Sequence, residues 1–267
     1  DLHSFPTRRS SDLSLIEDYD SVCPKLLHQY HDRFIHPANC KVIITGGYHE
    51  TDIHQLSTLL SDAARHAGET GAVQFTPTPI QPSAERLVEA SAGFDTVQAA
   101  VRVGATMPTS DHRDQPLIRL VASILGGYFG SRLMSNVRET HGYTYDIHGT
   151  MYNVPFGNAY VIKTETSTRY AHDTVRQIHA EMRRLATEPI STDELQNVRN
   201  YMTGHASRRY EWNFNLPQVL MNLLAAQRTF DDLLEEYHQL HRATPEEIMD
   251  VAVHYFAPER FTNCIVR

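Results

Sequence analysis

The chain has 267 residues, of which 41% are hydrophobic and 21% charged, so it is long enough for one large globular domain or two smaller ones. The net charge of −8 argues against nucleic acid as a partner, because binding to phosphates requires clusters of Lys and Arg. No stretch approaches the length of about 18 apolar residues that a transmembrane helix needs, so the sequence predicts no membrane span.

The first 75 residues form two sequence blocks. Residues 1–13 are polar, show no periodicity and lack the apolar segment of a signal peptide, so we expect a disordered or artefactual tail. Residues 14–75 predict a helix at 21–34, a strand at 41–45 and a helix at 51–67. The second helix carries its apolar residues at helical spacing: Ile53, Leu56, Leu59, Leu60, Ala63 and Ala64.

A proline-rich stretch at residues 76–84 separates this block from residues 85–267. Pro77, Pro79 and Pro82 hold the backbone extended and remove hydrogen-bond donors, which is typical of a linker. We therefore expect a domain boundary here.

The second block begins with predicted strands at 86–92 and 97–107. In the latter, Val97, Ala99, Val101 and Val103 alternate with other residues, as in a half-buried strand. The elements expected next are a helix at 116–125, a glycine-rich turn, a short helix through Arg138, and strands at 143–152 and 159–165.

Helices dominate the last third of the sequence. Ser191 and Glu194 have the spacing of a capping box that opens a helix to about residue 209, and Thr244 and Glu247 open another with a proline in its first turn. A final strand is expected at 261–266. Strands first and helices grouped later predict an α+β fold, with a mostly antiparallel sheet covered by helices.

Residues 126–149 carry the main candidate site, because Arg138 stands seven residues before Tyr145. A guanidinium and a phenol at a helix-to-strand junction can both donate hydrogen bonds to a peptide carbonyl or an oxyanion. The alternative is structural: Arg138 pairs with Glu139, Glu165 or Asp146, and Tyr145 is an ordinary sheet aromatic. On the residues alone, the structural reading is favoured.

Four glycines flank this pair and are expected to form tight turns and close backbone contacts. They are Gly126, Gly127, Gly130 and Gly142.

The sequence offers no metal site. Neither His-x-x-Glu-His nor His-Glu-x-x-His occurs among its 16 histidines, although those patterns place two imidazoles on one helical face. The spaced pairs His28/His31 and His238/His241 have no third ligand nearby, so we interpret them as facing solvent or a partner. The three cysteines lack metal-ligand spacing and cannot all pair within the chain.

The segment LGGYFGSRLMSNVRETHGYTYDIHG resembles the second-domain signature of the pitrilysin/insulinase-type zinc metallopeptidases, and more closely that of their short bacterial branch related to the mitochondrial processing peptidase. The residues that match the family pattern are Ser131, Arg132, Leu133, Arg138, Glu139, Gly142 and Tyr145. Flanking segments are similar too: residues 27–47 resemble the end of the family's first domain, and residues from Ile190 and from Thr244 resemble its later helices. The resemblance covers residues 14–267.

This resemblance implies repeated α+β domains that enclose a chamber. It assigns residues 14–75 to the end of the first domain, and residues 85–267 to a second, substrate-orienting domain without zinc. In the family, one domain holds zinc through His-x-x-Glu-His and a distal glutamate, and an Arg/Tyr pair on the partner domain orients the scissile peptide. Carried over, that pair is Arg138 and Tyr145.

The zinc motif is absent from this sequence, so the chain is expected to bind no cofactor and to be inactive alone, with zinc on a missing domain or a partner. The motif is absent either because the chain is truncated from a full peptidase or because the native protein is a non-catalytic subunit. The expected partners are a peptide or unfolded polypeptide and a zinc-bearing domain or subunit, in a homo- or heterodimer. The alternative function is a structural subunit, like the core proteins of the cytochrome bc1 complex. The sequence does not decide between bacterial periplasm and cytoplasm.

Overall fold

The computed structural model describes residues 22–66, 85–91, 96–108, 113–154, 157–211, 215–225 and 228–267. The expected tail at 1–13 and the linker at 76–84 lie outside these residues. The chain divides into two compact units, one of Asp1–Thr76 with Asn213–Gln218 and the other of Pro77–Trp212 with Val219–Arg267.

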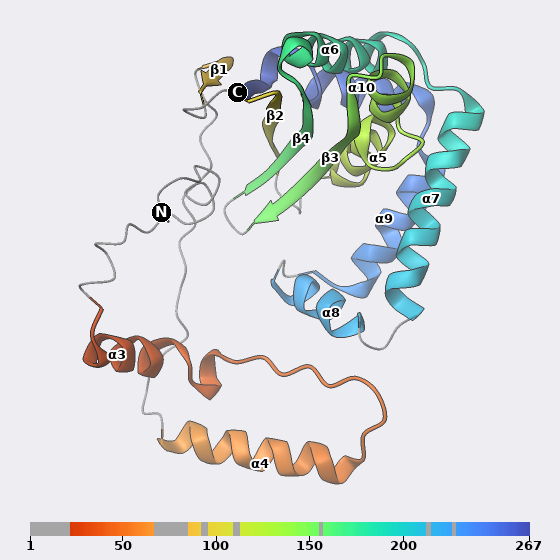
Figure 1. Cartoon of the computed structure of the whole chain (residues 1–267). Helices are drawn as coiled ribbons and strands as arrows, with labels where there is room; N and C mark the ends of the chain where they lie inside the picture. Colours follow the sequence, from red (N-terminus) through yellow and green to blue (C-terminus); the bar gives the residue numbers. More distant parts are fainter. Residues whose placement is uncertain are drawn as a thin grey trace. The chain divides into compact units, whose positions relative to one another are not determined.

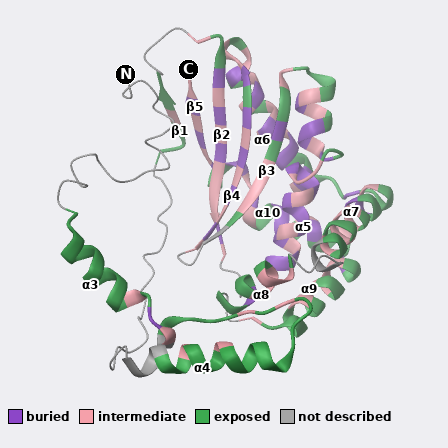
Figure 2. Ribbon diagram, turned by 60° about the horizontal axis from the view of Figure 1, so that its bottom comes forward, coloured by how far each residue is buried: buried purple, intermediate pink, exposed green. Residues whose placement is uncertain are grey.

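The larger unit is built on a five-stranded sheet (Figure 1), whose strand order β1-β5-β2-β4-β3 can be followed in Figure 2. The strands are β1 (Leu87–Ala90), β2 (Gln98–Met107), β3 (Thr144–Val154), β4 (Gly157–Ser167) and β5 (Thr262–Val266). Only β1 and β5 run parallel, and the other neighbours are antiparallel. The sheet is therefore mixed but mostly antiparallel, as the α+β prediction requires.

Two helices pack against this sheet, α5 (Gln115–Gly126) and α6 (Ala171–Thr187), and α10 (Pro245–Tyr255) packs against both of them. Alternate strand residues face them and are buried, as in Ala99, Val101 and Val103 of β2 (Figure 2). The strand begins at Gln98 and not at Val97, whose side chain is 86% exposed. The predicted alternation therefore holds except at its first member.

Further helices are α7 (Thr192–Glu211), α9 (Phe230–Arg242) and the short 3₁₀ helices η3 (Thr168–Tyr170) and η4 (Pro258–Arg260), while the first residues of α8 (Leu216–Ala225) belong to the smaller unit. At the start of α10 the predicted capping box is complete, since Thr244 and Glu247 exchange both hydrogen bonds. At the start of α7 the backbone N–H of Glu194 donates to Ser191 Oγ at 3.2 Å. The Glu194 carboxylate instead binds Arg132.

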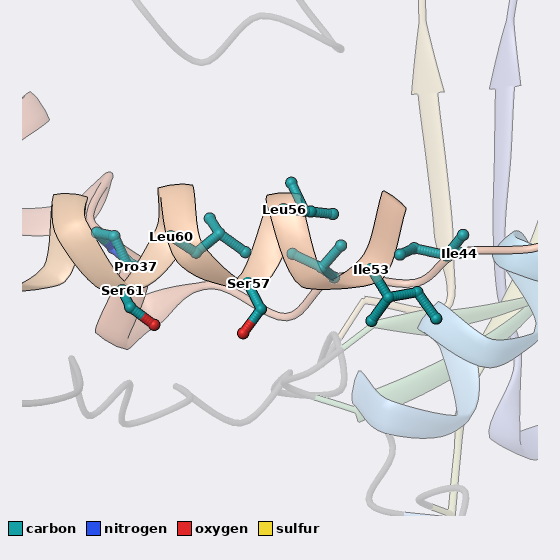
Figure 3. A pocket seen from close by; sticks show the side chains of 8 residues that line it. Pro37, Ile44, Ile53, Leu56, Ser57, Leu60 and Ser61 are labelled. Atoms are coloured by element: carbon teal, nitrogen blue, oxygen red, sulfur yellow. The ribbon is translucent and has the colours of Figure 1, made fainter. Parts of the chain in front are cut away.

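The smaller unit contains α3 (Pro24–Phe34), η1 (Pro37–Asn39) and α4 (Glu50–His66), close to the two predicted helices. The prediction of a strand at 41–45 is wrong, because no described segment forms a β-ladder with these residues. A sequence that favours a strand needs a neighbouring strand to satisfy its backbone. Here an apolar groove lies between residues 42–44 and α4, lined by Pro37, Val42, Ile44, Ile53, Leu56, Ser57, Leu60 and Ser61 (Figure 3).

The two units contain the same succession of a helix and a short 3₁₀ helix. α3 and α10 each have 11 residues and begin with proline, and each is followed two residues later by a three-residue 3₁₀ helix that also begins with proline. In the larger unit this helix leads into β5, whereas in the smaller unit it leads into residues 41–45. The same local design thus ends in a ladder strand in one unit, and in the other in a segment that no described strand joins in a ladder.

Candidate functional site

The candidate site lies on the connection from α5 to β3, where α5 ends closely packed against the sheet. A Cβ atom added at Gly126 would lie 2.9 Å from the backbone nitrogen of Gly149 on β3, and 3.2 Å from the hydroxyl of Tyr160. Glycine is therefore required for this approach. The same holds at Gly127, where a Cβ would lie 2.6 Å from Ser123 Cα, which agrees with the predicted close backbone contacts.

The segment then forms the π-helix η2 (Met134–Thr140), which carries Arg138. Its wide turn is seen in the hydrogen bond from the N–H of His141 to the carbonyl of Asn136, at 3.0 Å. Gly142 ends the helix with φ of +63°, a left-handed conformation that favours glycine. Its N–H donates to the carbonyl of Arg138 at 3.1 Å. This turn directs the chain into β3, where Tyr145 follows.

Arg138 lies against two aromatic rings. Its Cζ atom is 4.8 Å from the ring centre of Phe129 and 5.5 Å from that of Tyr145, both within cation–π distance. The structure thus brings together the two residues expected at the site. It adds Phe129, which the sequence analysis did not select because an aromatic residue in a glycine-rich turn has no distinctive signal.

The ion pairs considered for Arg138 are not present in the described part of the chain. Glu165 binds Arg102 at 2.7 Å, and Asp146 contacts His148 at 3.0 Å. Among the described residues no carboxylate forms an ion pair with Arg138. The contacts that its guanidinium makes in the described part of the chain are those with the two aromatic rings.

Tyr145 lies at a bulge of β3. The register with β4 shifts between Thr144 and Ile147, so Tyr145 is outside the regular ladder, and its side chain is 88% exposed. Thr164 holds the bulge, since its hydroxyl donates to the carbonyl of Asp146 at 2.7 Å. Bulges redirect side chains out of a sheet, and this one presents the phenol to solvent.

Two carboxylates anchor the segment that carries Arg138. Glu194 of α7 accepts two hydrogen bonds from Arg132, at 2.7 and 3.0 Å. Glu181 of α6 is 1% exposed and accepts a hydrogen bond from Asn136 at 2.5 Å. Because these contacts lie before and within η2, Arg138 projects from a fixed base.

A second aromatic contact fixes the glycine-rich turn. The rings of Tyr128 and Tyr201 stack with centres 4.9 Å apart. Burial, followed by the nearby charge of Glu194, raises the pKa of Tyr128. A Cβ at Gly130 would lie 2.7 Å from the Tyr128 ring, so this glycine also has the packing role predicted for it.

The described ranges contain no group of three or more His, Cys, Asp or Glu side chains that could hold a metal ion. In the two spaced histidine pairs, Nδ1 of His31 lies 3.2 Å from Oδ1 of Asp32, and the ring centre of His241 lies 4.4 Å from that of Tyr237. None of the helices in these ranges is long and apolar enough to cross a membrane.

Comparison with known proteins extends these findings. The model of the peptidase M16 inactive domain matches residues 22–202. No curated protein matches the chain.

Solved structures share the fold at low sequence identity. The peptidase M16 inactive domain from Pseudomonas fluorescens has a TM-score of 0.79 at 16% identity, covering 92% of this chain and 58% of its own. A protease from Helicobacter pylori has a TM-score of 0.75 at 14% identity, covering 95% of this chain and 61% of its own. A chain of complex III2 from Candida albicans has a TM-score of 0.58 at 11% identity, covering 78% of this chain and 51% of its own. The chain thus spans about three fifths of the first two structures.

Proposed function

Because the chain belongs to the family of peptidase M16 inactive domains, we propose that it binds a peptide and orients it for a zinc-bearing domain or subunit. The observation that carries this proposal is the guanidinium of Arg138, which lies between two exposed rings without a described carboxylate partner. A charged donor held in this way suits a carbonyl oxygen, and the neighbouring phenol of Tyr145 supplies a further donor.

The chain's own residues can bind and polarise a carbonyl. Arg138 donates from a planar, permanently charged group, and the hydrogen bond strengthens as negative charge develops on the oxygen. Rigid anchoring of η2 reduces the cost of ordering these donors around the ligand. These residues therefore account for orientation of the substrate and not for its hydrolysis.

Zinc, which the family implies, does not fit the described residues of this chain. Those residues bring together no three ligands of the type that zinc requires. We therefore assign the zinc to another domain or to a partner chain in a homo- or heterodimer.

The smaller unit is proposed to be the closing part of the first of two domains of the same type, the larger unit being the second. Its support is the spacing shared by α3–η1 and α10–η4. In the larger unit, β5 lies between β1 and β2, and Ile265 is buried in the core. By analogy, residues 41–45 would be completed by strands on both sides.

A structural subunit without a peptide ligand is the second candidate. It is supported by the fold similarity to a chain of complex III2, a multi-subunit assembly. A purely structural role gives no reason for an arginine that has no ion pair among the described residues and lies beside an exposed tyrosine, so peptide binding is the better account.

Peptide affinity distinguishes the two functions. We expect a labelled unstructured peptide to bind the chain, and Arg138→Ala to weaken binding at least tenfold, with Tyr145→Phe giving a smaller loss. Arg169→Ala is the matched control, since Arg169 also lies over a tyrosine ring, at 4.4 Å from Tyr170, but on another element. Unchanged affinity in both site variants would support the structural subunit.

A further inference from the structure

Phe129 is a large apolar residue in an exposed position, with 66% of its surface accessible. Its neighbour Tyr128 stacks on Tyr201, and Gly130 leaves room for the Tyr128 ring. The turn thus fixes one aromatic ring inward and holds the next one outward. Core packing does not explain the position of the Phe129 ring, because an exposed ring does not contribute the free energy that burial of apolar surface provides.

The outward ring lies against Arg138, nearer to the guanidinium than Tyr145 does. Each ring covers part of the guanidinium surface and restricts its side chain before any ligand arrives. The ring of Phe129 itself remains mostly open to solvent. Beside the hydrogen-bonding donors of Arg138 there is therefore an open apolar surface.

A peptide that places a carbonyl at Arg138 must also place a side chain nearby. The carbonyl carbon and the side chain are attached to the same Cα, about 1.5 Å from each. A carbonyl oxygen in hydrogen-bond contact with the guanidinium therefore brings that side chain to the neighbourhood of a ring centred 4.8 Å from Arg138 Cζ.

We propose that Phe129 determines the specificity of this site, by receiving a large apolar side chain of the residue whose carbonyl Arg138 binds. The preferred ligand is a peptide with an aromatic or long aliphatic residue at that position. This inference rests on the proposed function, since it requires a peptide carbonyl at Arg138.

The test uses the full chain and two acetylated, amidated fluorescent peptides that differ only in a central Phe or Ser. Blocked ends remove the terminal carboxylate, so any binding at Arg138 is to a carbonyl. We expect the Phe peptide to bind wild type about tenfold more tightly than the Ser peptide. Phe129→Ala should abolish this preference, because it weakens binding of the Phe peptide about tenfold more than binding of the Ser peptide.

Two further variants complete the test. Phe129→Leu, which keeps an apolar surface, should retain most of the preference, and Phe230→Ala, which removes an exposed ring of α9, should retain all of it. A preference that persists in Phe129→Ala would overturn the inference. Equal weakening of both peptides by Phe129→Ala would also overturn it, because the ring would then only support Arg138.

Arg138→Ala separates this inference from the proposed function. Loss of binding of both peptides in Arg138→Ala, with the preference intact in Phe129→Ala, would leave the function standing and refute the specificity. Full binding of both peptides by Arg138→Ala would refute the proposed function itself. Thermal unfolding of each variant establishes that the comparison is between folded chains.

Discussion

Arg132 and Glu194 form a two-point ion pair, with Nε to Oε1 at 2.7 Å and Nη2 to Oε2 at 3.0 Å. This contact joins Arg132, two residues before η2, to the first turn of α7. It also explains why the capping box expected at Ser191 is only half formed, since the carboxylate that would complete it is bound to Arg132. A tertiary contact has replaced a local one.

Removing this carboxylate charge is expected to destabilise the fold. In Glu194→Gln the guanidinium of Arg132, only 12% exposed, loses its counter-charge, at a cost of about 2 to 3 kcal/mol in the free energy of unfolding. Urea denaturation measures this loss in the free energy of unfolding. Glu235→Gln is the control, because its pair with Arg242 is exposed and should contribute less than about 1 kcal/mol. Equal losses in both variants would contradict the anchoring role.

Gly149 is expected to tolerate no side chain. A Cβ atom there would lie 1.9 Å from the hydroxyl of Tyr160, which is fully buried and bonded to the carbonyl of Ala122. Gly149→Ala should therefore cost about 3 kcal/mol through forced displacement of core groups. Gly204→Ala in α7 meets no atom within 4 Å and should stabilise the helix by about 0.5 to 1 kcal/mol. Similar melting temperatures for the two variants would contradict this prediction, because the sheet would then accommodate the added methyl group at position 149.

His179 is expected to make stability depend on pH. Burial lowers its pKa, against the opposing effect of its hydrogen bond to Asn263 at 2.9 Å. Because the unfolded chain binds the proton more readily, His179 stabilises the fold above its ordinary pKa of about 6.5, and this stabilisation is lost as the pH falls below it. Melting temperatures at pH 7 and pH 5 should differ less in His179→Gln than in wild type. An unchanged difference would exclude this histidine as a contributor.

The smaller unit is expected to associate through its apolar surface. Leu27, Val42 and Leu59 are all exposed there, and no described strand pairs with residues 41–45. Sedimentation velocity should show association that increases with concentration and falls in Leu27→Glu/Val42→Asp. Val253→Asp, an exposed position on α10, serves as the control. A chain that stays monomeric at high concentration would contradict this expectation.

Local signals in the sequence predicted much of the fold. The alternation of buried and more exposed residues in β2 and the capping box at Thr244 depend on residues that are close in sequence, and both appear in the structure. Residues 41–45 show the limit of such signals, because a strand exists only with a partner that local sequence does not reveal. The same limit applies at the site: Arg138 and Tyr145 were selected by motif, but the contact with Phe129 depends on how the glycine-rich turn folds.

The central claim is that Arg138 and Tyr145 hold the same peptide group, and a double-mutant cycle tests it most directly. Peptide dissociation constants are measured for wild type, Arg138→Ala, Tyr145→Phe and the double variant. If both donors bind one carbonyl, the loss in the double variant should differ from the sum of the single losses by at least about 0.5 kcal/mol. Losses that add within error, or an affinity that neither substitution changes, would contradict the account.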